Sequence, residues 1–270
     1  MTRAFADWLA LREPADAAAR APDLVEPLRR RLAGTPRAVI HDLGSGTGSM
    51  GRWLAPRLSG PQHWIMYDRD AYLLERAMSG MVDTAADSAP VTVEARERDI
   101  ARLTADDLAG ACLITASALL DMLTAEEVER VVVACAGAGC PVLFTISVIG
   151  RVELTPPDPL DADLAEAFNA HQRRTAGGRR LLGPDAVDAT AAAFGRHGVT
   201  VRVRPSPWRL GADRADLISE WLRGWLDAAC EQRPELAGPA AEYARRRLAD
   251  AADGRLDVVV GHHDLLANCE

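Results

Sequence analysis

A glycine-rich turn directly after a short apolar strand constrains the fold of this chain more than any other feature. Residues 39–48 read VIHDLGSGTG, and we expect a helix from about Ser49 that Pro56 limits or bends. Glycines at alternating positions let the backbone turn tightly and approach a ligand without a Cβ in the way. The first turn of the helix would add free backbone N–H groups. The segment therefore predicts a fold that binds a ligand where a strand ends.

Short apolar runs alternate with helical segments along most of the chain. We predict strands at residues 38–40, 64–67, 91–93, 111–115, 141–149, 199–203 and 256–261. We predict helices within residues 1–33 and at 71–82, 124–137, 160–173, 184–196, 213–230 and 239–252. This alternation implies an α/β fold, with a mostly parallel, doubly wound sheet and helices on both faces.

The same pattern divides the chain into four parts. These are an N-terminal helical cap (1–36), a ligand-binding core (37–149), a substrate-facing insertion or lid (150–183), and the rest of the sheet with a helical insertion at 213–253 (184–270). The third part is set apart because its prolines and paired glycines break the rhythm after a central strand. In the last part, a stripe with Trp221 and Trp225 indicates core packing or the face of a homodimer.

Composition excludes several classes of function. All 31 basic residues are arginines, so a Schiff base, a pyridoxal-phosphate linkage or a P-loop lysine is impossible. The net charge of −8 argues against a nucleic-acid partner. The five cysteines, Cys269 among them, form no CxxC pair, so we expect no disulfide framework, no metal site and a cytoplasmic location. No apolar run reaches the ~18 residues of a membrane span, and we expect no membrane partner.

Two registers of the glycine-rich turn predict different ligands. Gly46, Gly48 and Gly51 fit the GxGxxG fingerprint, so an NAD(P)-dependent oxidoreductase is one alternative. The register that starts at Gly44, directly after the strand, is favoured by Asp42, because a pyrophosphate would meet an unfavourable negative charge there. An ammonium group would instead be stabilised. A cationic ligand with little phosphate fits S-adenosylmethionine.

Two segments resemble the first two motifs of class I S-adenosylmethionine-dependent methyltransferases. They are HDLGSGTG at 41–48 and WIMYDRDAYLLERA at 64–77. The resemblance covers residues 37–149 firmly and 184–262 more loosely. It implies a Rossmann-like sheet of seven strands with the last antiparallel, N-terminal helices and helical insertions that cap the site, and S-adenosyl-L-homocysteine as the product of the cofactor.

The resemblance also implies cofactor-binding residues, position by position. Asp42 would orient the ammonium, Asp68 would accept hydrogen bonds from both ribose hydroxyls, and Asp99 would accept them from the adenine N6. The other positions that it implies are Gly44, Ser45, Gly46, Gly48, Arg69, Ile100, Ala116 and Ser117.

The acceptor is less constrained. The fourth predicted strand ends in TASA (115–118), which differs from the Pro-Pro-aromatic box used to methylate nucleobase amines. Together with the acidic charge, this favours a small-molecule acceptor, methylated on oxygen or nitrogen. The candidate general bases are Asp121 and His171, with His262, His263 and Asp264 behind them. The candidate acceptor contacts are Trp8, Arg173 and Trp208, with Arg174 and Arg209 as further arginines.

A catalytically silent S-adenosylmethionine-binding protein is a second alternative. It is favoured if Asp121, His171 and His262 all lie far from the cofactor. The remaining histidine of note, His41, falls inside the first predicted strand and is expected to be a core residue.

Overall fold

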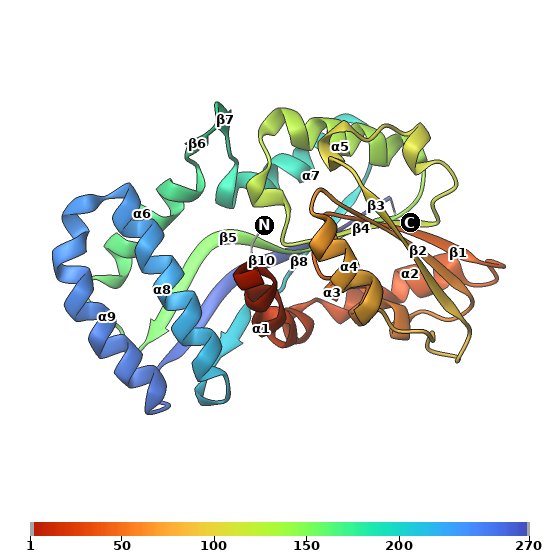
Figure 1. The fold of residues 1–270 in the computed structure, drawn as a ribbon. Coiled ribbons are helices and arrows are strands. Elements are labelled where there is room, and N and C mark those ends of the chain that lie inside the picture. The colour runs from red at the N-terminus through yellow and green to blue at the C-terminus, as the bar shows by residue number, and fades with distance from the viewer. Residues whose placement is uncertain (1–2, 269–270) are drawn as a thin grey trace.

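The computed structural model describes residues 3–268, in which eight strands form one sheet with helices on both faces (Figure 1). The helices are α1 (Arg3–Ala19), α2 (Val25–Leu32), α3 (Ser49–Leu54), α4 (Ala71–Gly80), α5 (Ala125–Ala138), α6 (Asp161–Gln172), α7 (Ala186–Arg196), α8 (Ala215–Gln232) and α9 (Ala237–Ala252). The strands are β1 (Ala38–Leu43), β2 (Gln62–Asp68), β3 (Val91–Glu97), β4 (Leu113–Ser117), β5 (Val142–Thr155), β8 (Val201–Pro205), β9 (Trp208–Leu210) and β10 (Asp257–Ala267). A separate hairpin pairs β6 (Thr175–Ala176) with β7 (Arg179–Arg180).

The sheet has the order β3-β2-β1-β4-β5-β10-β8, and β9 pairs with β10. Strands β1 to β5 are parallel, whereas β10 runs antiparallel to both of its long neighbours. The predicted Rossmann-like, mostly parallel sheet with an antiparallel last strand is confirmed. The three-residue strand β9 is an addition that the sequence did not predict. Because the order reverses between β1 and β4, a crevice forms at their carboxyl ends, where open α/β sheets bind ligands.

Two apolar layers hold helices against the two faces of the sheet. On one face, α5 and α7 bury Val132 and Phe194 against Phe144 of β5. On the other, α2, α3 and α4 bury side chains such as Leu28 and Leu54 under β1 and β2. The caps follow local chemistry: Thr124 and Glu127 form a capping box on α5.

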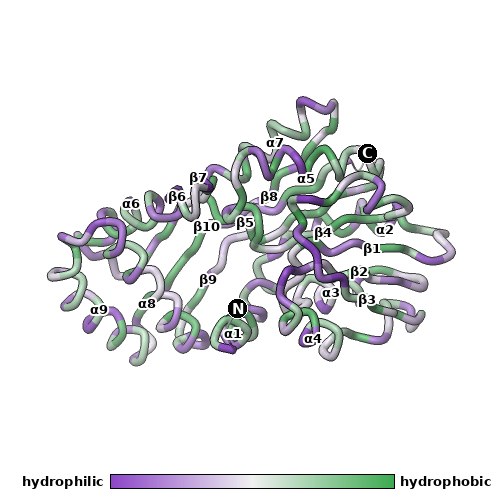
Figure 2. The backbone as a smooth tube through the Cα atoms, turned by 45° about the horizontal axis from the view of Figure 1, so that its top comes forward, coloured by the Kyte–Doolittle hydropathy of each residue, from purple (hydrophilic) through white to green (hydrophobic). Residues whose placement is uncertain are grey.

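A third apolar cluster lies beyond the main sheet, in an arm built on the far ends of β5 and β10. These two strands pair from Asp257 and Thr155 to Ala267 and Val142, so each continues six residues past its predicted end. Helices α6, α8 and α9 pack on the arm (Figure 1) and carry both hydrophilic and hydrophobic residues along their length (Figure 2). Trp221 and Trp225 stack within this cluster with ring centres 5.3 Å apart, so the predicted stripe is core.

The sequence prediction ended this strand at 149, whereas β5 continues to Thr155. Gly150 has φ +73° and lies where the pairing register shifts, between Val260 and His262 of β10. Residues 152–155 then pair with β10, which satisfies backbone groups on that side of the strand. None of the helices within residues 3–268 is both long and apolar enough to cross a membrane.

Candidate functional site

A cavity of about 890 Å³ lies at the carboxyl ends of the parallel strands. The segments that follow β1, β2, β3 and β4 line it, together with part of β5 and one side of α1. It therefore occupies the crevice that the reversal of strand order creates. Figure 1 shows α1 crossing in front of this end of the sheet.

Asp42 of β1 gives the cavity a fully buried carboxyl group. Its Oδ1 accepts a 2.7 Å hydrogen bond from Oγ1 of Thr115, which stands beside it on β4. Its Oδ2 is buried and has no hydrogen-bond partner within residues 3–268, and the residue lines the cavity. Burial raises the pKa of Asp42 to about 7, while the Thr115 hydroxyl and the charge of Arg20 lower it. An unpaired carboxyl group in this environment favours a cationic partner and disfavours an anionic one.

The glycine-rich turn adopts the conformation that its sequence predicts. Gly44 and Gly46 have φ of +63° and +54°, a left-handed region that favours glycine. A Cβ on Gly44 would lie 2.9 Å from Cδ1 of Leu119. The Gly46 N–H donates to Oδ2 of Asp68 over 3.0 Å, so the turn is tied to the end of β2. The backbone can therefore approach a ligand closely here.

Asp68 ends β2 and lines the cavity together with Arg69. Its Oδ1 accepts from the backbone N–H of Asp70, and Asp70 itself caps α4 as predicted. Each Asp68 oxygen thus takes one backbone hydrogen bond and keeps a further lone pair for a ligand hydroxyl. Asp99 and Ile100 also line the cavity, where Asp99 caps a short turn through the Ala101 N–H.

β4 and β5 separate at two residues with positive φ. Ala118 has φ +51° and Ile146 has φ +56°, the latter a costly conformation for a β-branched side chain. Buried Asp264 holds this kink, because its Oδ1 accepts from the Ile146 N–H and its Oδ2 from the Ala21 N–H, both over 2.8 Å. Asp264 therefore supports the cavity from behind. Ser117, Ala118 and Ile146 all line it.

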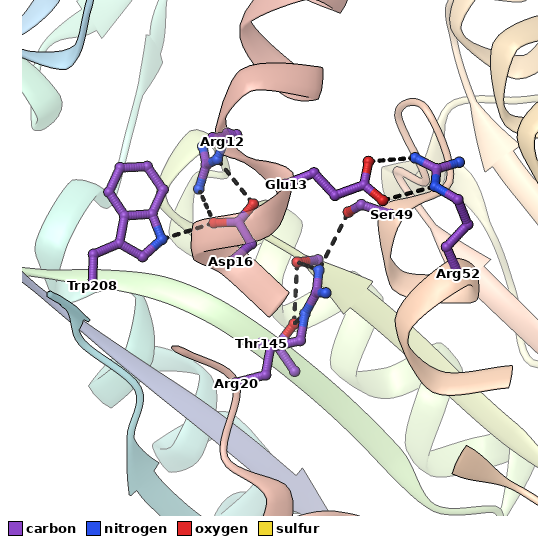
Figure 3. Close-up of polar contacts among 9 residues, drawn as sticks. Arg12, Glu13, Asp16, Arg20, Ser49, Arg52, Thr145 and Trp208 are labelled. Carbon is purple, nitrogen blue, oxygen red and sulfur yellow. Dashed lines mark hydrogen bonds and ion pairs between the residues drawn. The ribbon is translucent and has the colours of Figure 1, made fainter. Parts of the chain in front are cut away.

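One side of α1 closes the cavity with apolar and aromatic side chains. Phe5, Trp8, Leu9 and Arg12 line it. The Arg12 guanidinium donates two hydrogen bonds to Asp16, of 3.0 and 3.1 Å, and lies 4.8 Å from the ring centre of Trp208. Trp208 Nε1 also donates to Asp16 over 2.9 Å, which fixes α1 against β9 (Figure 3).

Asp121 places a second carboxyl group with a raised pKa in the cavity. It lies on the turn Leu120–Met122 after β4, beside the cavity-lining apolar residues Leu119 and Leu123. Burial raises the pKa of Asp121 to about 6, with smaller lowering effects from Arg12 and Arg174. At neutral pH this group is a carboxylate of unusual basicity, as a general base requires.

Two of the predicted cofactor positions do not line the cavity. Gly48 begins α3 with φ +86°, and Ala116 is buried within β4. Gly48 belongs to the turn that holds Gly44 and Gly46, and Ala116 belongs to the strand that holds Ser117. The remaining predicted cofactor positions, Asp42, Gly44, Ser45, Gly46, Asp68, Arg69, Asp99, Ile100 and Ser117, do line it.

Of the predicted acceptor and catalytic residues, the structure brings Trp8 and Asp121 to the cavity but leaves His171, Arg173 and Trp208 outside its lining. The reason is that α6 packs on α8: His171 Nε2 lies 3.2 Å from a Glu231 carboxylate oxygen. Arg173 pairs with Asp185 instead. Among the described residues of the predicted lid, 150–183, the cavity lining takes in Arg179.

The other two histidines of interest are core residues. His262 is buried against Trp208, with ring centres 5.2 Å apart, and burial lowers its pKa to about 3. His41 stacks on Tyr67 at 5.6 Å, as predicted for a core histidine. Neither lines the cavity.

Sequence reasoning missed Arg20, which follows α1. Arg20 is 2% exposed, and its guanidinium donates to the hydroxyls of Ser117 (3.1 Å), Ser49 (3.3 Å) and Thr145 (3.3 Å) (Figure 3). It also lies 5.2 Å from the ring centre of Trp53. The chain has 31 arginines, and Arg20 lies in an alanine-rich segment. No short motif around it therefore indicates a role in the site.

Comparisons with known proteins find similarity to solved structures only. No family model and no curated protein matches the chain. A SAM-dependent methyltransferase from Geobacter sulfurreducens, in complex with S-adenosyl-L-homocysteine, is 17% identical with a TM-score of 0.48 over 98% of each chain. A second, from Thiobacillus denitrificans with the same ligand, is 18% identical with a TM-score of 0.47 over 98% of each chain.

Magnesium protoporphyrin IX methyltransferase from Synechocystis PCC 6803 is 13% identical with a TM-score of 0.43, over 76% of this chain and 82% of that one.

Proposed function

We propose that this chain is an S-adenosylmethionine-dependent methyltransferase that acts on a small-molecule acceptor. The observation that carries the proposal is the buried Oδ2 of Asp42 beside the glycine-rich turn, which receives no hydrogen bond from the described part of the chain. A ligand ammonium would satisfy it, whereas the pyrophosphate of a dinucleotide would be repelled. This favours S-adenosylmethionine over NAD(P), although Asp68 would suit the ribose of either ligand.

The residues of the cavity fit the parts of such a cofactor. Asp42 would hold the ammonium, the turn at Gly44–Gly46 would pass close to the methionyl chain, and Asp68 would accept from the ribose hydroxyls. Asp99 and Ile100 would take the adenine. When bound, the cofactor supplies a methyl group on a sulfonium for in-line displacement.

The protein's own contribution is alignment and proton removal. The apolar wall of α1 and the kink at Ile146 enclose the space next to Ser117, which excludes water and orients an acceptor there. Asp121 would take the proton that an oxygen or nitrogen acceptor loses. Because this carboxyl group lies in the cavity, a silent binding protein is the less favoured alternative.

A titration with S-adenosyl-L-homocysteine and with NAD tests the proposal. We expect the first ligand to bind and to raise the melting temperature by mass action, and NAD to do neither. Asp68→Ala should weaken the binding of S-adenosyl-L-homocysteine at least ~100-fold, since a bidentate charge-assisted contact is lost.

Asp188→Ala, an exposed change on α7, is the matched control and should leave the dissociation constant unchanged. Binding of NAD alone, or an unchanged dissociation constant for Asp68→Ala, would contradict the proposal.

A further inference from the structure

We propose that the methyl acceptor is an aromatic carboxylic acid whose ring carries the methylated hydroxyl or amino group, and that Arg12 binds its carboxylate. The inference rests on the proposed function, because it concerns the acceptor in the same cavity. It adds the chemical class of that acceptor, and it assigns to Arg12 a ligand contact besides its pairing with Asp16.

Arg12 uses only one edge of its guanidinium within the described part of the chain. Its Nε and NH2 donate to the two oxygens of Asp16, over 3.0 and 3.1 Å. The other edge, formed by NH1 and the second N–H of NH2, donates to no residue among 3–268. Because the side chain is 14% exposed and lines the cavity, this edge is available to a ligand there. Its two donors match the two oxygens of a carboxylate.

Arg12 lies near Asp121 rather than near Asp42. Its positive charge lowers the pKa of Asp121, whereas Arg20 is the cation that lowers the pKa of Asp42. The Arg12 guanidinium also lies 4.8 Å from the ring centre of Trp208, which belongs to the apolar cluster of the arm. The unused edge is therefore on the side of the proposed general base and not beside the amino acid end of the cofactor.

Asp121 is close enough to Arg12 for this charge effect but does not pair with it. Within residues 3–268, Arg12 forms an ion pair with Asp16 alone, and no other residue donates a hydrogen bond to the Asp121 carboxyl group. A cation with an unused edge and an unpaired carboxyl group thus line one cavity without meeting. A ligand between them needs an anionic group at one end and a group that can lose a proton at the other.

The walls beside these two groups favour a planar ring. Four lining residues of α1 recur at helical spacing and therefore share one side of the helix: Phe5, Trp8, Leu9 and Arg12. Apolar side chains of β5 and of the segment after β4 add to the lining: Met122, Leu123, Ile146 and Val148. The Arg12 guanidinium lies 5.8 Å from the ring centre of Trp8. A carboxylate bound to Arg12 would therefore place an attached aromatic ring beside the Trp8 indole.

The transfer step balances without a further reactant. A lone pair of the acceptor oxygen or nitrogen forms a bond to the methyl carbon, while the bond from that carbon to sulfur breaks and its electron pair stays on sulfur as a neutral thioether. Asp121 takes the proton that the acceptor loses. Arg12 makes and breaks no covalent bond, but it holds the carboxylate so that the hydroxyl or amino group reaches the methyl carbon.

Aromatic acids and their primary amides test this assignment, because each amide has nearly the shape of its acid but no charge. The probes are the hydroxybenzoates, the aminobenzoates and the hydroxynaphthoates. With the wild-type protein saturated with S-adenosyl-L-homocysteine, we expect calorimetry to show at least one acid that binds about tenfold more tightly than its amide. With S-adenosylmethionine in its place, mass spectrometry should find the methyl group on the ring oxygen or nitrogen of that acid.

Arg12→Lys tests the role of the second edge. A lysine keeps a cation for Asp16, but its single ammonium has no second fork for a carboxylate. We expect the preference for the acid over the amide to fall below about threefold, while the dissociation constant of S-adenosyl-L-homocysteine stays within about threefold. The preference is a ratio of two dissociation constants, so a partial loss of folded protein would not change it. Arg3→Lys, an exposed change on the same helix outside the cavity lining, is the matched control and should keep the full preference.

Four results would overturn the inference. They are a wild-type protein that binds each amide as tightly as its acid, a full preference for the acid in Arg12→Lys, no binding of any of the acids, and a methyl ester as the product. The ester would show that the carboxylate lies at the methyl group and not on Arg12. A protein that does not bind S-adenosyl-L-homocysteine would overturn the proposed function itself, so the two failures can be told apart.

Discussion

The two sides of the cavity differ in how they are built. The strand-end side consists of Asp42, the glycine-rich turn and Asp68, all within 27 consecutive residues of two adjacent parallel strands. The α1 side consists of apolar side chains fixed by a network that joins Arg12 and Asp16 to Trp208, 192 residues away in sequence. The strand-end side is polar and carries an unpaired oxygen, whereas the α1 side pairs its charges with each other.

This difference indicates that the strand-end side binds the ligand and that the α1 side shapes the cavity. Unpaired polar groups at the carboxyl ends of the strands stay available to bind a ligand. Burying them lowers the free energy of unfolding, and the apolar core of the sheet offsets this loss. Paired charges on α1 instead fix the position of a helix whose apolar face shapes the remaining space. Substitutions on the two sides should therefore affect different measurements.

The largest expected effect is a loss of stability on the α1 side. Asp16→Ala leaves the partly buried Arg12 guanidinium and the buried Trp208 N–H without their acceptor, so we expect the free energy of unfolding to fall by about 3 kcal/mol or more. Chemical denaturation measures it. Glu153→Ala, in an exposed pair with Arg151, should cost less than ~1 kcal/mol. Equal losses in the two variants would show that α1 is not fixed by this network.

The next effect has the opposite sign and belongs to the strand-end side. The pKa of Asp42 is raised to about 7 in the folded protein, so the carboxyl group destabilises the fold as the pH rises from about 4 to 7. Asp42→Asn removes this penalty and should stabilise the ligand-free protein by up to ~4 kcal/mol at pH 8, with little change at pH 4. Melting curves at both pH values measure it, and the same variant should lose ligand binding. A destabilised variant at pH 8 would contradict the assignment.

Of the substitutions considered, one at Asp121 should change the affinity for the cofactor least. Asp121→Asn should leave the dissociation constant of S-adenosyl-L-homocysteine within about twofold, because we propose that this residue serves the acceptor and not the cofactor. Carbon-detected NMR of the wild-type protein should show a carboxyl titration with a pKa of about 6, which the variant lacks. If this substitution weakens cofactor binding as strongly as Asp68→Ala, Asp121 belongs to the cofactor site and the proposed role as a general base for the acceptor is wrong.

The contrast between the two sides also explains what the sequence could predict. Asp42, Gly44 and Asp68 follow from local patterns, since each stands at a strand end whose apolar run and glycines can be recognised without the rest of the fold. The paired burial of Arg20 and the approach of Arg12 to Trp208 depend on tertiary packing, which one sequence does not encode in any short window.

His171 is a residue whose predicted place in the site was wrong because its position also depends on tertiary packing. Its position in an insertion after a central strand suggested a lid, but α6 is drawn to α8 by apolar residues such as Leu164 and Leu222, and His171 goes with it. The extension of β5 through Thr155 likewise depends on pairing with β10, more than 100 residues later. Strand centres, the motif and the helices α6, α8 and α9 were predictable as elements, whereas the packing of these helices on the extended strands was not.

The central claim is that Asp42 binds a ligand ammonium, and the pH dependence of ligand affinity tests it most directly. Since protonated Asp42 must lose its proton to pair with the ammonium, the dissociation constant of S-adenosyl-L-homocysteine should rise about tenfold from pH 7.5 to pH 6. Calorimetry in buffers of different ionisation enthalpy should show a released proton at pH 6. For 5′-methylthioadenosine, which lacks the amine, affinity should not change with pH. A pH-independent constant for S-adenosyl-L-homocysteine, or the same slope for both ligands, would contradict the claim.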